Sequence, residues 1–120
     1  MPVTNSILII DDDPVILDVL AEAFRFHGYT VFTAETGTAG LDIFDKEQID
    51  IVLTDIRVPG LSVDELATRI RKESPHTKVA VMTGGDGEIG SSLINNGTAD
   101  LFFLKHFALS HVCTTISDRK

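Results

Sequence analysis

The stretch "ILIIDDDP", residues 7–14, runs four aliphatic side chains directly into three carboxylates and a proline. A short apolar run bounded by polar residues predicts a buried strand of the kind found in parallel sheets. Packing alone does not explain the acids that follow, because adjacent carboxylates repel one another and resist leaving water. We therefore expect a positive group or ion to bind where this strand ends.

Aliphatic runs of the same kind recur along the chain, at residues 7–10, 30–33, 49–54, 79–82 and 101–104. Between the runs, apolar residues stand three or four positions apart, as on one face of a helix. These residues are Ile16, Leu20, Ala23 and Phe24, then Leu41 and Phe44, then Val63, Leu66, Ala67 and Ile70. Strictly alternating strands and helices predict an α/β fold, a (βα)5 doubly wound parallel sheet of five strands with helices on both faces. The length of 120 residues predicts one domain, residues 1–120.

Turn residues agree with these helix boundaries. Pro14 suits the first turn of the first helix, Gly28 suits its end, and Pro75 suits the stop after the third helix. We expect Asp13 to cap or flank the first helix, because acidic side chains are stabilising at a helix N-terminus.

The bulk composition excludes several classes of function. A formal net charge of −8 without a Lys/Arg block argues against nucleic-acid binding by this domain. The four histidines lack the paired spacing of zinc ligands, and the one cysteine, Cys113, has apolar neighbours at helical spacing that predict a buried side chain. No apolar stretch is long enough to cross a membrane, and the first residues do not predict a secretory signal, so we expect a cytoplasmic location.

Polar residues follow four of the five predicted strands. Asp11 and Asp12 follow the first, Asp55 ends the third, Thr83 follows the fourth and Lys105 follows the fifth. In a doubly wound sheet the ligand site lies beyond the carboxyl ends of the strands, so these side chains should meet. Clustered carboxylates favour a hard cation such as Mg²⁺, while a lysine and a hydroxyl suit phosphoryl oxygens. The pattern predicts phosphoryl transfer, with Asp55 as the nucleophile.

These motifs resemble the receiver domain of two-component response regulators, the CheY-like family, over essentially the whole chain. The acidic pair is "IIDD" with Asp11 and Asp12, and the phosphoacceptor loop is "TDIRVPG" with Asp55. The later motifs are "VMTG" with Thr83 and "FFLKHF" with Lys105. The resemblance implies a flavodoxin-like sheet with the strand order 2-1-3-4-5.

The resemblance also implies a role for each acid. Asp55 would accept a phosphoryl group from the phosphohistidine of a partner kinase, in a reaction that depends on Mg²⁺. Asp12, Asp55 and the backbone carbonyl of Arg57 would bind the ion directly, and Asp11 would act largely through a bound water. Such a domain is a switch and not a turnover enzyme, since it catalyses only its own phosphoryl transfer and dephosphorylation.

The remaining implied roles concern the response to phosphorylation. Lys105 would pair with the phosphoryl group, Thr83 would move to hydrogen-bond it, and Phe102 matches the aromatic residue that turns inward with the threonine. The implied partners are a sensor histidine kinase or phosphotransfer protein, and a downstream effector protein or a missing C-terminal output domain. Whether the domain forms a homodimer is left open by the sequence.

Two positions depart from the family pattern. His106 stands where a proline usually follows the lysine, which predicts either a trans bond with a shifted loop or a strained cis bond. Val63 stands at a position that is usually glycine, so we expect the loop into the third helix to differ or the helix to start earlier.

The segment "GGDGEIGSSLINNG" after Thr83 is rich in poor helix formers, which predicts a marginal fourth helix that phosphorylation reshapes. Its "GDGEIG" matches G-x-G-x-x-G, but it follows the fourth strand, whereas a dinucleotide fold has the motif after the first.

Two alternative functions stay open. A haloacid-dehalogenase-like phosphohydrolase would use Asp11 as its nucleophile, with Asp11 and Asp13 forming its D-x-D motif. A pseudo-receiver would keep the fold as a protein-interaction module and never accept a phosphoryl group.

Overall fold

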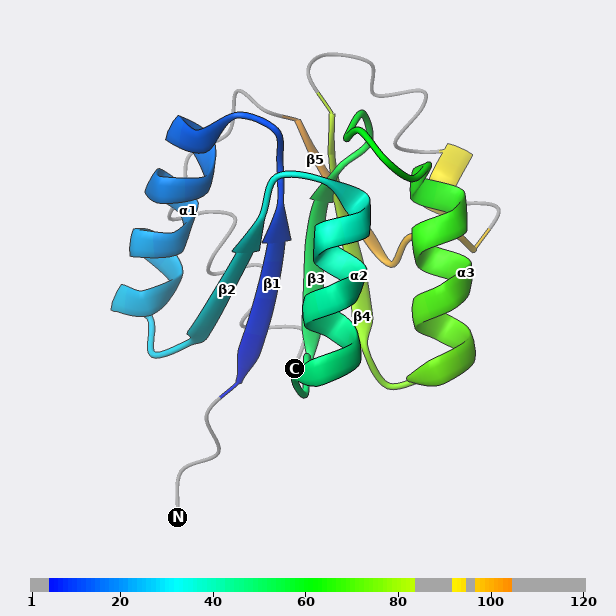
Figure 1. The fold of residues 1–120 in the computed structure, drawn as a ribbon, viewed down its shortest axis with the longest axis horizontal. Helices are drawn as coiled ribbons and strands as arrows, with labels where there is room; N and C mark the ends of the chain where they lie inside the picture. The colour runs from blue at the N-terminus through cyan, green and yellow to red at the C-terminus, as the bar shows by residue number, and fades with distance from the viewer. Residues whose placement is uncertain (1–4, 84–91, 95–96, 105–120) are drawn as a thin grey trace.

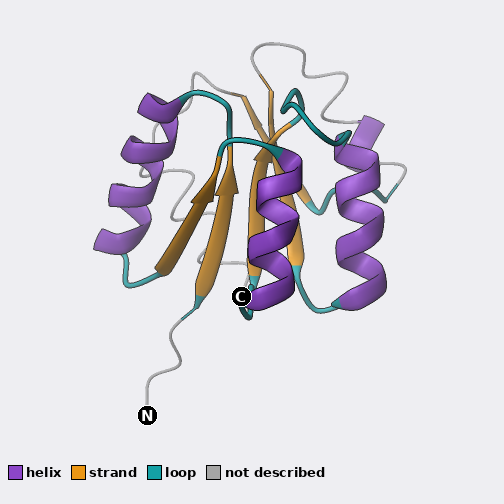
Figure 2. Cartoon of the chain, viewed as in Figure 1, coloured by secondary structure: helices purple, strands orange, loops and turns teal. Residues whose placement is uncertain are grey.

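The computed structural model describes residues 5–83, 92–94 and 97–104. The described strands and long helices follow in the order β1 (Ser6–Ile10), α1 (Pro14–Phe26), β2 (Thr30–Ala34), α2 (Gly37–Lys46), β3 (Ile51–Asp55), α3 (Val63–Glu73), β4 (Lys78–Thr83) and β5 (Leu101–Leu104). The five strands form one parallel sheet in the order β2-β1-β3-β4-β5 (Figures 1 and 2). The predicted fold class and strand order are confirmed.

Helices cover both faces of the sheet because alternate strand residues point to opposite sides. On one face, Leu8, Val52 and Val81 pack with buried side chains of α2 and α3, which lie side by side in Figure 1. On the other face, Ile9, Leu53 and neighbouring strand residues pack against α1. Strand residues therefore contribute to two cores, one on each face of the sheet.

The first helix begins and ends as the sequence predicts. The Asp13 side chain caps α1 by accepting a hydrogen bond of 2.9 Å from the backbone N–H of Val15, and Pro14 is its first residue. After the helix, Gly28 adopts a φ of +90° and donates its N–H to the carbonyl of Arg25. This left-handed conformation is strained for residues with a Cβ, which explains the glycine.

The loop into α3 accommodates Val63 inside the helix. Ser62 caps α3 by a reciprocal capping box with Glu65, so Val63 is the first helical residue. In this loop Gly60 has a positive φ of +99°. The β-branched side chain therefore avoids the conformation that it tolerates badly. Pro75 follows the C-cap of α3, as expected.

The strand bounds differ from the predicted runs by at most two residues, and the buried face of α1 also differs. β3 begins at Ile51, whereas the apolar run begins at residue 49; Ile49 is buried but lies in the preceding loop. The buried face of α1 is centred on Leu17 and Ala21, while Ile16 and Ala23 are half-buried. In β3 and in α1 the apolar residues correctly predict that the segment is buried. They do not fix where the strand starts or which side of the helix is buried, because several alternatives bury a similar number of apolar side chains.

Some predictions lie outside the described residues. These are the predictions for Lys105, His106 and Cys113, for the "GDGEIG" motif and for most of the fourth helix, of which residues 92–94 are described as helical. Among the described helices, none has the length and apolarity to cross a lipid bilayer.

Candidate functional site

Three carboxylates meet where the neighbouring strands β1 and β3 end. Asp11 and Asp12 follow β1, and Asp55 is the last residue of β3. One carboxylate oxygen from each of the three lies within 4.8 Å of the others. Asp11 is completely buried and Asp55 is 7% exposed, whereas Asp12 is exposed. We call Asp11, Asp12 and Asp55 the acidic cluster.

Backbone hydrogen bonds fix the turn that carries Asp11. Its N–H donates to the carbonyl of Ala34 at 3.1 Å, which extends the pairing of β1 with β2 by one residue. Its carboxylate Oδ1 accepts the N–H of Asp13 at 2.9 Å. The chain then enters α1 with Asp13 as its cap. Of the three consecutive acids, Asp11 is therefore buried in the cluster, Asp12 lies at its surface, and Asp13 caps α1.

Asp55 is held by the sheet and by the loop that it begins. The Thr54 hydroxyl donates to the backbone carbonyl of Asp55 at 2.9 Å, and the N–H of Ile56 donates to the carbonyl of Met82 at 3.0 Å. The carboxylate Oδ1 of Asp55 accepts the N–H of Arg57 at 3.1 Å. This last bond folds the loop back over the carboxylate, so Arg57 stays next to the acidic cluster.

Thr83 and Phe102 lie on the strands beyond β3. Asp55 is paired with Met82 of β4, so buried Thr83 stands one residue further along the neighbouring strand. Phe102 of β5 is paired with Val81 and is half-buried against the core that faces α2 and α3. The structure thus brings Asp11, Asp12 and Asp55 together and places Thr83 at the same edge of the sheet.

The donor set suits a hard divalent cation. Three carboxylates within 4.8 Å concentrate negative charge at a partly buried position. Mg²⁺ prefers oxygen ligands and is commonly held by one or two carboxylates together with waters. Neither the partial exposure of the cluster nor its ligand type fits a structural zinc site, which takes mainly sulfur and nitrogen ligands.

The sequence prediction missed the support of the loop after Asp55. The N–H of Gly37, the first residue of α2, donates to the carbonyl of Pro59 at 2.9 Å. A contact between a helix start and a loop has no periodic signature in the sequence. The glycines of "TGTAG" and "VPGLS" are the one local hint that two backbones approach closely here.

A family model named "Response regulator receiver domain" matches residues 7–117. The chain belongs to this family. Receiver domains are signalling modules of two-component systems, with phosphorylation and Mg²⁺ binding at an acidic cluster as family features. The family predicted from the sequence is confirmed.

Curated relatives place the receiver domain in proteins of different length. The chain is 35% identical over 104 residues to sporulation initiation phosphotransferase F of Bacillus subtilis, covering 87% of this chain and 81% of that protein. It is also 35% identical over 77 residues to the transcriptional regulatory protein GlrR of Escherichia coli, which covers 64% of this chain. That match spans only 17% of the length of GlrR.

Solved receiver domains have the same fold. A CheY-like receiver domain from Methanospirillum hungatei superposes with a TM-score of 0.88 at 30% identity, covering 98% of this chain and 94% of that one. The response regulator TrrA of Thermotoga maritima, solved in complex with Mg²⁺ and BeF, has a TM-score of 0.83 at 30% identity. That match covers 96% of this chain and 98% of TrrA.

Proposed function

We propose that this receiver domain, residues 1–120, is a phosphoacceptor switch in which Asp55 accepts a phosphoryl group from a phosphohistidine. The observation that carries the proposal is the convergence of three carboxylate oxygens within 4.8 Å at the carboxyl edge of the sheet. Asp55 suits the role of nucleophile because it ends a central strand and is fixed by both the sheet and its loop. The donor would be a sensor histidine kinase or a phosphotransfer protein.

The chemistry needs a positioned carboxylate and neutralised charge. A carboxylate oxygen of Asp55 attacks the phosphorus, the P–N bond to the donor imidazole breaks, and the imidazole nitrogen takes up a proton. The product is an acyl phosphate on Asp55. Asp12, Asp55 and the backbone carbonyl of Arg57 would hold Mg²⁺ directly, and Asp11 would hold it largely through a bound water. When bound, the ion supplies positive charge for the phosphoryl oxygens as their charge changes.

The response to phosphorylation would run through β4 and β5. Thr83 is buried at the end of β4, from which its hydroxyl would hydrogen-bond the phosphoryl group. Lys105 follows the last residue of β5 and would pair with the same group. Phe102, half-buried on β5, would turn further inward as Thr83 moves. The altered surface would then change binding to an effector protein or to an attached output domain.

The relatives support both kinds of output. Sporulation initiation phosphotransferase F is close to the length of this chain, whereas GlrR is several times longer. A receiver domain of this family therefore occurs both nearly alone and as a small part of a transcriptional regulator. Both a separate effector and an attached output domain are consistent with the proposal.

Intact mass spectrometry tests the proposal. The protein is incubated with acetyl phosphate, with Mg²⁺ or with EDTA, and compared with Asp55→Asn and with Asp50→Asn from the opposite edge of the sheet. We expect a hydroxylamine-labile phosphoryl adduct on the unmodified protein and on Asp50→Asn, only with Mg²⁺, and none on Asp55→Asn. An adduct that survives Asp55→Asn would make Asp11 the candidate nucleophile, as in a phosphohydrolase. No adduct on the unmodified protein under any condition would favour a pseudo-receiver.

A further inference from the structure

The loop after Asp55 packs backbone to backbone against the first turn of α2. Besides the hydrogen bond from Gly37 to Pro59, Gly37 lies directly against Leu61. A Cβ built on Gly37 would lie 2.9 Å from the Cβ of Leu61 and 3.3 Å from its backbone nitrogen. Both neighbours are close to the main chain, so they cannot rotate away as the end of a long side chain can.

The contact has a second glycine on the loop side. Gly60 has a φ of +99°, and a Cβ there would lie 2.8 Å from the Oγ1 of Thr38 and 3.4 Å from its backbone nitrogen. The two segments therefore approach each other at consecutive positions, with a glycine on each side. We call this contact the Gly37–Gly60 clamp.

The clamp lies at one end of a short segment whose other end is the acidic cluster. Asp55 accepts the N–H of Arg57 at 3.1 Å, and Pro59 accepts the N–H of Gly37 at 2.9 Å. Arg57 is thus two residues from an attachment point on either side. With both ends of the segment attached, a shift of the loop at Leu61 that reaches Pro59 is taken up between Pro59 and Asp55.

We propose that Gly37 is a positioning residue for the metal site: by allowing α2 to touch the loop, it sets where the backbone carbonyl of Arg57 stands relative to the acidic cluster. This inference rests on the proposed function, which makes that carbonyl a ligand of Mg²⁺. Supporting residues outside the ligand set commonly change metal affinity by about 10–100-fold when they are altered.

The backbone conformation at Gly37 is one that alanine can adopt. Among the described glycines a positive φ occurs at Gly28, Gly60 and Gly97 and not at Gly37, so alanine fits the helical conformation there. Alanine also favours a helix over glycine by about 1 kcal/mol. The expected effect of Gly37→Ala therefore comes from the collision with Leu61 and not from the helix itself.

Magnesium titration with a metal-free control measures the effect. We expect Gly37→Ala to bind Mg²⁺ about tenfold more weakly than the unmodified protein, by isothermal titration calorimetry. In metal-free Gly37→Ala, amide hydrogen exchange at Arg57 and at position 37 should be faster than in the unmodified protein, because both hydrogen bonds of the segment are displaced. Removing the opposing Cβ leaves only the contact with the backbone of residue 61, so Gly37→Ala should weaken Mg²⁺ binding less in a Leu61→Gly background than in the unmodified protein.

Gly40→Ala is the matched control for general destabilisation. It adds the same methyl group three residues along α2, where it meets the Cδ1 of Ile10 at 2.5 Å instead of the loop. We expect Gly40→Ala to lower the melting temperature and to leave the Mg²⁺ affinity within about twofold, because the added methyl group meets the end of the Ile10 side chain and leaves the loop after Asp55 untouched. An equal loss of affinity in Gly40→Ala, or an unchanged affinity in Gly37→Ala, would overturn the inference. Failure of the unmodified protein to bind Mg²⁺ would instead contradict the proposed function.

Discussion

The two edges of the sheet use acidic residues in opposite ways. At the amino edge, Asp50 and Ser6 form a reciprocal pair: the Ser6 N–H donates to the Oδ2 of Asp50 at 2.9 Å, and the Asp50 N–H donates to the Oγ of Ser6 at 3.1 Å. This pair joins the starts of β1 and β3. The carboxylate of Asp50 therefore serves the fold by satisfying backbone and side-chain donors.

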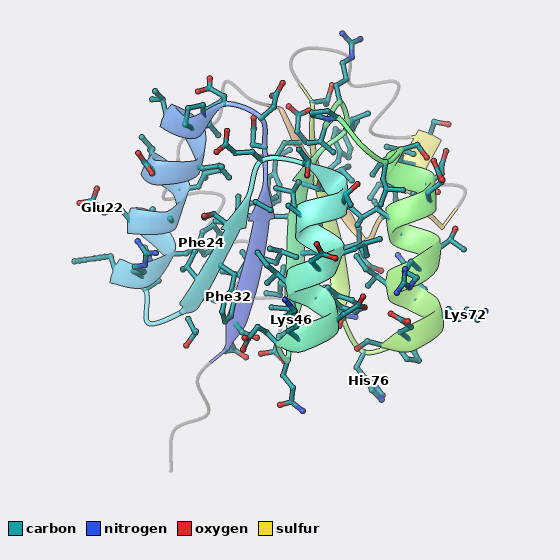
Figure 3. The ribbon with its side chains drawn as sticks, in the orientation of Figure 1. Glu22, Phe24, Phe32, Lys46, Lys72 and His76 are labelled. Carbon is teal, nitrogen blue, oxygen red and sulfur yellow. The ribbon has the colours of Figure 1, made fainter. Side chains whose placement is uncertain are left out.

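Two further acids near the amino edge lie beside a cation. The guanidinium of Arg69 reaches Asp45 on α2 and Glu73 on α3, each at 3.1 Å. The hydrogen bond to Glu73, followed by the charge of Asp45, raises the pKa of Arg69 above its usual value. A cleft of about 460 Å³ lies here, lined by these acids, Asp50 and His76, which Figure 3 shows at the turn below α3. Asp45, Asp50 and Glu73 are thus each matched by donors of the chain.

The carboxyl edge gathers its acids against one another. Asp11 and Asp55 each accept a backbone N–H, but those bonds leave three carboxylates within 4.8 Å. Like charges at that separation raise the free energy of the folded state unless a cation joins them. The comparison teaches that the number of acids does not indicate a binding site, whereas the placement of acids against each other makes a position a candidate for one.

The largest expected difference between the edges is in metal binding. Asp12→Asn should weaken Mg²⁺ binding by about two orders of magnitude, because it removes a charged ligand while leaving the exposed position sterically unchanged. Asp50→Asn should leave the affinity within about twofold, since Asp50 lies at the opposite end of β3. Calorimetric titration of both variants would settle this, and equal losses in the two would remove the distinction between the edges.

An intermediate effect is expected on stability at the amino edge. Asp50→Ala should lower the free energy of unfolding by about 1–2 kcal/mol, because the partly buried N–H of Ser6 loses its acceptor. Asp18→Ala, at an exposed position on α1, is the control and should change stability by less than about 0.5 kcal/mol. Urea denaturation without Mg²⁺ measures both. If Asp50→Ala proves no less stable than Asp18→Ala, the Ser6–Asp50 pair does not stabilise the fold.

The smallest expected effect is a gain in stability. Without metal, Asp12→Asn should raise the free energy of unfolding by about 0.5–1 kcal/mol, because it relieves repulsion within the acidic cluster. The gain should shrink as ionic strength rises, since salt screens charges at an exposed position. With Mg²⁺ present, the unmodified protein should be more stable than Asp12→Asn, because the ion stabilises only a chain that binds it. A metal-free variant that is less stable than the unmodified protein would argue against repulsion in the cluster.

Residue patterns alone predicted most of the fold. The aliphatic runs placed five strands, and Pro14, Gly28 and Pro75 placed the ends of helices, because each residue acts through its own backbone conformation. The buried face of α1 was predicted less well. Its sequence "PVILDVLAEAF" carries apolar residues on more than one side, so the choice of Leu17 over Ile16 depends on how the helix packs against the sheet.

The acids of the site were predictable, but their support was not. Asp11 and Asp12 follow a buried strand and Asp55 ends another, and parallel strands end at a common edge, so strand topology brings the three together. The Gly37–Gly60 clamp and the Ser6–Asp50 pair join residues more than twenty positions apart through a few local contacts. Such contacts depend on how loops of particular length meet, which no period in the sequence encodes.

The most direct test of the central claim is to locate the phosphoryl group. The protein is phosphorylated with acetyl phosphate and Mg²⁺, reduced with borohydride, which converts an aspartyl phosphate to homoserine, and mapped by tandem mass spectrometry of its peptides. The account predicts homoserine at position 55 and at no other position. Homoserine at position 11 or 12, with aspartate intact at 55, would contradict it.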